Sequence, residues 1–121
     1  MRLLIVAIAL MIAGSALALE KKNFQLKNAA GLVEICSVPA DDPLYINAKE
    51  FCNGYLVGAF QYYDATAPAS NRFVCAPSPR PSRTAVMQRF VDWAKEHPQY
   101  MNDRAVDTLF RFLAQAYPCK N

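Results

Sequence analysis

The sequence contains no G-x-S-x-G or H-E-x-x-H motif, no C-x2-C pair and no glycine-rich phosphate-binding loop. It has a single histidine, His97, and no recognisable nucleophile motif that would make this residue part of a catalytic triad. A structural zinc site built from the four cysteines is disfavoured as well, because such sites nearly always use C-x2-C pairs. These absences predict a protein that is not an enzyme and that needs no metal and no cofactor.

Long runs of one charge are also missing. The formal net charge is only +3, and no block of like charge is longer than Lys21-Lys22. Nucleic-acid binding and anionic-membrane binding therefore have little electrostatic support. No apolar run approaches the length of about 20 residues that spans a bilayer, so no membrane span is predicted in the mature protein.

The first 18 residues have the pattern of an export leader. Arg2 precedes an uncharged apolar run from Leu3 to Ala13, and Ala16-x-Ala18 fits the preference of signal peptidase. A retained N-terminal anchor is the weaker alternative. We therefore predict a cleaved signal peptide over residues 1–18, a single domain over 19–121 and a periplasmic location.

Four cysteines follow this leader, an even number that in an oxidising compartment indicates two disulfides. Their connectivity follows only weakly from the sequence. Antiparallel packing of the last two helices would bring Cys119 near Cys75 in the fold, but Cys75 can instead fold back onto Cys52. The pairing expected here is Cys52–Cys75 and Cys36–Cys119.

The remainder is predicted to be all-α, a compact bundle of about four helices stapled by the two disulfides. Apolar residues recur at helical spacing, and no segment shows the period-2 alternation of a strand. Residues 66–81 hold four prolines and are predicted to form a long loop. Four helix starts are indicated by residues that cap helices: Asn28, Asp42 followed by Pro43, Ser82 and Asn102.

The second of these helices is nearly continuously apolar between Phe51 and Phe60, so we predict that it is the central one, surrounded by the others. Gly54 and Gly58 lie four residues apart on it, and each lowers helix stability by up to about 1 kcal/mol relative to alanine. Their spacing suggests a groove for close approach of another backbone. Packing inside the domain is the favoured interpretation, and packing in a homodimer is the alternative.

Recognition remains as the function that the residues support. Arginine and tyrosine are the types most enriched at protein–protein hot spots, and several of them lie around the proline-rich loop or near helix ends. The alternative is that these residues solvate the loop and fill the edge of the core. The predicted partner-binding residues are Tyr62, Tyr63, Arg72, Arg80, Arg83 and Tyr100.

The order of several short motifs resembles the Rap/Tai family of immunity proteins. The motifs are A-G-L-V-E-I-C (30–36), F-C-N-G-Y-L-V-G (51–58), a cysteine-proline loop around Cys75, F-V-D-W-A-K-E-H-P-Q-Y (90–100) and A-Y-P-C (116–119). The resemblance spans essentially the whole mature chain. Its framework residues here are Cys36, Cys52, Gly54, Tyr55, Gly58, Cys75, His97, Pro98 and Cys119.

The resemblance implies a small helical periplasmic protein, commonly dimeric and without catalytic activity. It also implies the partner, a cognate cysteine-histidine amidase that attacks peptidoglycan after delivery by a type VI secretion system, whose cleft the protein blocks. The arginine- and proline-rich loop departs from the family pattern and suggests a different partner. Two alternatives are a small periplasmic binding or acid-stress chaperone-like protein without a toxin partner, and a small hydrolase.

Overall fold

The computed structural model describes residues 18–120, so the predicted leader lies outside it except for Ala18. This part of the chain forms four α-helices and no β-strand, which confirms the all-α prediction. The helices are α1 (Ala29–Cys36), α2 (Tyr45–Thr66), α3 (Arg83–Lys95) and α4 (Ala105–Ala116). One 3-10 turn precedes α1 and two lie between later helices: η1 (Lys21–Phe24), η2 (Ala69–Asn71, between α2 and α3) and η3 (Pro98–Tyr100, between α3 and α4).

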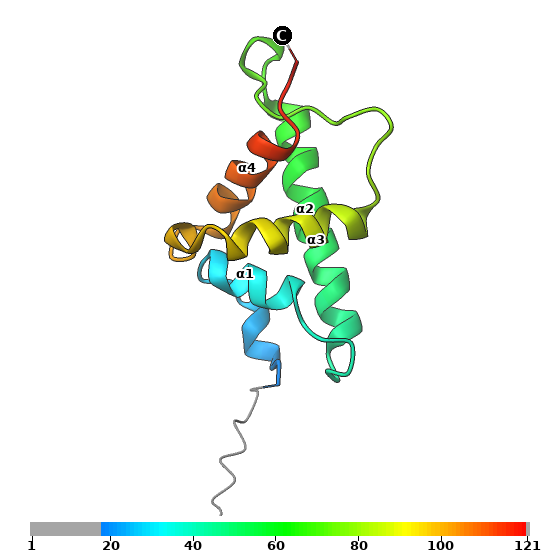
Figure 1. The fold of residues 1–121 in the computed structure, drawn as a ribbon, viewed down its shortest axis with the longest axis vertical. Helices are drawn as coiled ribbons and strands as arrows, with labels where there is room; N and C mark the ends of the chain where they lie inside the picture. Colours follow the sequence, from blue (N-terminus) through cyan, green and yellow to red (C-terminus); the bar gives the residue numbers. More distant parts are fainter. Residues whose placement is uncertain (1–17, 121) are drawn as a thin grey trace, which may run out of the picture.

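The short helix α1, and not α2, is the centre of the bundle. In Figure 1, α2 runs the length of the molecule. The helix α3 crosses α2, and α4 lies toward the C-terminal half of α2. The helix α1 contacts η1, α2, α3 and α4, and its Leu32 and Ile35 have no exposed surface. Only Ala48, Cys52 and Leu56 are buried on α2. The prediction that the other helices surround α2 was therefore wrong, because one face of it is left uncovered.

Two of the four helix starts follow from the predicted caps. The side-chain oxygen of Asn28 accepts a hydrogen bond from the amide of Gly31 at 3.1 Å, and the hydroxyl of Ser82 accepts one from the amide of Ala85 at 3.1 Å. Each satisfies one of the backbone N–H groups that the first turn of a helix leaves without a partner. Local side-chain chemistry thus fixes where α1 and α3 begin.

The other two helices start later than predicted. Asp42 does cap a turn, since its carboxylate accepts the amide of Leu44 at 2.7 Å, but α2 begins only at Tyr45. Pro43 therefore lies in that turn and not in the first turn of the helix. The helix α4 begins three residues after Asn102, because the chain first makes a further turn after η3.

The disulfide pairing differs from the expected one. The bonds are Cys36–Cys52 and Cys75–Cys119, and not Cys52–Cys75 and Cys36–Cys119. The short connection between α1 and α2 brings the end of α1 against the second turn of α2, with 5.2 Å between the Cα atoms of Cys36 and Cys52. Cys75 lies beside the C-terminal segment because its amide donates to the carbonyl of Tyr117 at 2.9 Å.

The glycines of α2 face open space. A Cβ atom built on Gly54 or on Gly58 would meet nothing within 4 Å. The favoured interpretation, a groove for packing inside the domain, is therefore wrong. On the same side of the helix Ile46 and Tyr62 are 67% and 75% exposed. Packing against a second copy of the chain stays a prediction.

We expect Gly54→Ala and Gly58→Ala each to raise the free energy of unfolding by up to about 1 kcal/mol. Each substitution removes the conformational freedom of glycine from the unfolded chain, and the methyl group has room in the fold. Urea denaturation gives the stability, and size-exclusion chromatography gives the oligomeric state. If the exposed side of α2 that carries Gly54, Gly58 and Tyr62, here called the glycine face, packs in a homodimer, the same substitutions will shift the protein toward monomer. A loss of stability in the monomer would contradict the prediction.

Candidate functional site

The loop between α2 and α3 is fastened to the last turns of α2 by two side chains. The hydroxyl oxygen of Tyr63 accepts hydrogen bonds from the amides of Phe73 and Val74 at 2.8 and 3.1 Å. The guanidinium of Arg72 pairs with the carboxylate of Asp64 and donates to its backbone carbonyl at 2.6 Å. Tyr63 and Arg72 thus hold the loop in place, which is a different role from the predicted contact with a partner.

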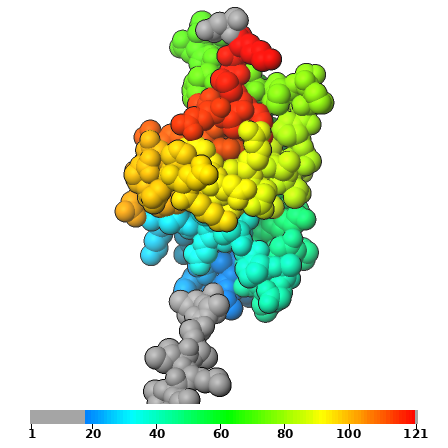
Figure 2. Space-filling view, viewed as in Figure 1, coloured from blue at the N-terminus to red at the C-terminus, as the bar shows by residue number. Residues whose placement is uncertain are grey.

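The same loop is also fastened to the C-terminal segment. The Cys75–Cys119 disulfide is flanked by an isolated antiparallel bridge between Val74 and Pro118. In Figure 2 the loop and the C-terminal segment lie together at one end of the molecule. The chain from Ala76 to the start of α3 is mostly exposed and includes the cis peptide bond Ser78–Pro79. This exposed part is short and held at both ends.

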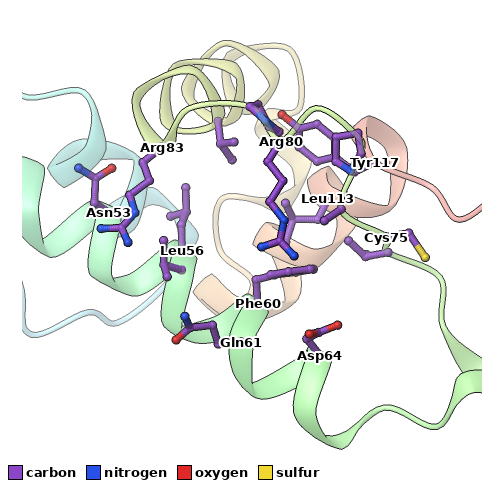
Figure 3. A pocket seen from close by; sticks show the side chains of 16 residues that line it. Asn53, Leu56, Phe60, Gln61, Asp64, Cys75, Arg80, Arg83, Leu113 and Tyr117 are labelled. Carbon is purple, nitrogen blue, oxygen red and sulfur yellow. The ribbon is translucent and has the colours of Figure 1, made fainter.

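A groove of about 420 Å³ lies between this loop, α2 and the last turn of α4. Leu56 and Phe60 of α2 line one side, and Leu113 and Tyr117 line the other, as Figure 3 shows. Sequence reasoning did not find these residues. The signal was present, since the α2 residues that line the groove recur at helical spacing: Asn53, Leu56, Val57, Phe60, Gln61 and Asp64.

Two arginines give the rim of this groove a positive charge. Arg80 and Arg83 are exposed, both line the groove, and neither takes part in an ion pair within residues 18–120. Asp64 also lines the groove, but its carboxylate is paired with Arg72. The buried side-chain oxygen of Asn53 has no hydrogen-bond partner among the residues that the structure describes. Apolar walls and arginines without an ion pair suit a ligand with an apolar part and a carboxylate beside it.

The structure does not gather all of the predicted partner-binding residues. Tyr62 is exposed on α2, on the glycine face. Tyr100 lies beyond the other end of α3, where it stacks on Trp93 at a centroid distance of 6.0 Å and Arg111 covers its ring at 4.6 Å. Only Arg80 and Arg83 share one site. Their contact with a partner stays a prediction.

His97 and Pro98 are found at the turn that joins α3 to α4. The His97 ring stacks on Trp93 at 4.1 Å, and its Nδ1 lies 2.7 Å from the Trp93 carbonyl oxygen. Pro98 begins η3. Tyr55 on α2 is half-buried, and this burial, with a smaller effect of Asp107, raises the pKa of its hydroxyl. These three framework residues therefore have structural roles in the fold.

Residues 18–120 offer neither a metal site nor a membrane-spanning helix. No group of three or more His, Cys, Asp or Glu side chains in this part of the chain is arranged to hold a metal ion. Nor does any helix there have the length and apolar character needed to cross a membrane.

A family model for Rap1a immunity proteins matches residues 28–119, from the cap of α1 to the last cysteine. The chain belongs to the Rap1a immunity family. No curated protein and no solved structure matches it significantly. The match includes all four helices and both disulfides, and it confirms the resemblance to Rap/Tai-type immunity proteins. Membership of this Rap1a family implies that the protein binds a cognate effector.

Proposed function

We propose that this Rap1a protein is an exported immunity protein that neutralises a peptidoglycan amidase delivered by a type VI secretion system. Family membership supports binding to an effector. The two disulfides are consistent with an oxidising compartment, where a cell-wall hydrolase would act. In this proposal the protein carries out no chemistry, and tight stoichiometric binding closes the substrate cleft of the amidase.

The observation that carries the proposed binding site is the fastened loop beside a positively charged groove. Tyr63 and Arg72 hold the loop on one side, and the Cys75–Cys119 disulfide holds it on the other. A surface that is already ordered loses little conformational entropy when it binds. Prolines restrict the exposed part further, because each fixes its own φ angle.

The groove favours one kind of contact on the effector. Its apolar walls would take an aliphatic or aromatic side chain, and Arg80 and Arg83 would pair with one or two neighbouring carboxylates. Arginine is suited to this role, because its planar guanidinium can bind a carboxylate through two parallel hydrogen bonds. We therefore propose that an acidic segment with an apolar anchor, at the rim of the amidase cleft, occupies the groove.

The test is direct binding and inhibition. The candidate effector to test is a small secreted cysteine-histidine hydrolase whose gene neighbours that of this protein. The oxidised protein, titrated into that hydrolase, should form a complex of fixed stoichiometry and stop digestion of purified peptidoglycan. An unrelated peptidoglycan amidase serves as the control and should stay active. If the hydrolase still digests peptidoglycan at an unchanged rate when this protein is present in molar excess, the proposed function is wrong.

A further inference from the structure

Leu19 is held in the fold by both its side chain and its backbone nitrogen. The side chain is 8% exposed and belongs to the hydrophobic core cluster, whereas the neighbours Ala18 and Glu20 are exposed. The backbone nitrogen donates a hydrogen bond to the carboxylate Oδ2 of Asp42 at 3.0 Å. Asp42 lies 23 residues away, in the turn between α1 and α2. This nitrogen therefore has a fixed partner that carries a negative charge.

More acidic residues lie near this nitrogen than an uncharged amide needs as hydrogen-bond acceptors. A shallow cavity beside it, of about 410 Å³, is lined by three acidic residues, Glu34 from α1 and Asp41 and Asp42 from the turn, and by no lysine or arginine. Glu20 is the next residue in the chain, and its carboxylate pairs with Lys22 at 3.0 Å. An amide N–H needs only one acceptor, whereas a cation is stabilised by every carboxylate nearby.

The sequence places a cleavage site directly before this nitrogen, since Ala16-x-Ala18 ends one residue before Leu19. We propose that Leu19 is the first residue of the mature protein and that its α-ammonium group forms an ion pair with Asp42. The export peptidase would hydrolyse the peptide bond between Ala18 and Leu19. Water supplies the oxygen of the new Ala18 carboxylate, and the freed Leu19 nitrogen takes up the protons that make it an ammonium group.

Two steps of maturation, cleavage of the leader and formation of the Cys36–Cys52 disulfide, would both stabilise the same end of the fold. Asp42 lies inside the segment closed by the Cys36–Cys52 disulfide, which forms only under oxidising conditions. In Figure 1 the first described residues and the α1–α2 turn lie at the same end of the molecule. Before export the chain has neither the disulfide nor the free ammonium, so its fold is less stable. After export both act on the same turn.

The proposal predicts a defined pH dependence. An unperturbed α-amino group has a pKa of about 7.7–8.0, and a carboxylate partner raises this pKa in the folded state. The ion pair then contributes its full stabilisation of the fold at pH values below the pKa of the amine in the unfolded chain. This stabilisation is lost as the pH rises through the higher pKa of the amine in the folded protein. The charged residues that line the cavity beside the amine are Glu34, Asp41 and Asp42, all acidic, and the adjacent Glu20 is paired with Lys22.

The experiment compares two oxidised proteins, one that begins at Leu19 and one that retains Ala16–Ala18. In the longer protein the Leu19 nitrogen is an uncharged amide. The acceptor is the Asp42 carboxylate in both proteins, so the difference is the charge on the nitrogen, and an ion pair near the surface contributes up to about 1 kcal/mol. We therefore expect the shorter protein to have a folding equilibrium constant about fivefold larger at pH 6.5, measured by urea denaturation. The difference should disappear by about pH 10.

Asp42→Asn should abolish this difference between the two proteins, while asparagine keeps the ability to cap the turn. The matched control is Asp41→Asn, at an exposed neighbour with no hydrogen bond to Leu19, and it should preserve most of the difference. Equal stabilities of the two proteins at pH 6.5 would overturn the proposal. So would mass spectrometry of the exported protein that shows a first residue other than Leu19. The proposal uses the export step of the proposed function but not the effector, so failure of effector binding would leave both measurements unchanged.

Discussion

Replacing both Cys75 and Cys119 with serine is expected to lower the free energy of unfolding by about 4 kcal/mol, and replacing both Cys36 and Cys52 by about 3 kcal/mol. The two bonds join residues 44 and 16 positions apart. A longer closed loop removes more entropy from the unfolded chain, which gives the order and the approximate size of the two effects. Urea denaturation of the two double variants, compared with the oxidised parent protein, measures both.

The Cys75–Cys119 bond should matter for binding as well as for stability. It fastens the loop beside the groove, so its removal should weaken effector binding beyond what the loss of folded protein explains. The Cys36–Cys52 variant is the control, because that bond joins α1 to the second turn of α2 and includes no residue of the loop. Peptide mapping of the unreduced protein checks the pairing itself. Recovery of a Cys36–Cys119 peptide would contradict the structure.

Features set by local chemistry could be predicted from the sequence. Asn28 and Ser82 were recognised as helix caps because a cap needs only its own side chain and the amide three residues on. The same reasoning placed the start of α2 too early. Asp42 and Pro43 have the residue types of a helix start, but the same types also form an isolated turn. Local chemistry does not distinguish the two.

The disulfide pairing and the core of the bundle depend on contacts between distant segments. Four cysteines allow three pairings. The pairing that forms depends on which part of the chain the loop after α2 packs against. The amide of Cys75 pairs with the carbonyl of Tyr117, a contact that no short-range pattern encodes. Gly54 and Gly58 show the same limit. Their spacing indicates that another backbone could approach, but the tertiary arrangement decides whether one does.

The partner-binding prediction combined residues that have different roles. Residue type suggested that Tyr63 and Arg72 contact a partner, yet both are used to hold the loop. Their polar groups point to backbone atoms of their own chain, which composition does not reveal. Arg80 and Arg83 are left as the charged residues of the groove. Whether Arg80 and Arg83 contact a partner stays a prediction.

The double substitution Arg80→Glu and Arg83→Glu is expected to weaken effector binding at least 100-fold, about 2.8 kcal/mol. It replaces two attractive pairs with repulsion at a site where the effector is proposed to place carboxylates, and juxtaposed like charges disfavour a complex by several kcal/mol. Neither arginine has an ion pair to lose within the described chain, so the fold should be little affected. Titration calorimetry measures the affinity, and thermal unfolding checks the stability.

The control must change the net charge by the same amount elsewhere. Lys21→Glu with Lys27→Glu does so, since both residues are exposed and neither takes part in an ion pair within residues 18–120. The control should lower the association rate only slightly, through the weaker overall field, and should leave the lifetime of the complex unchanged. If both double variants lose affinity equally, overall charge and not the groove governs binding. If neither loses affinity, the effector binds a different surface of the protein.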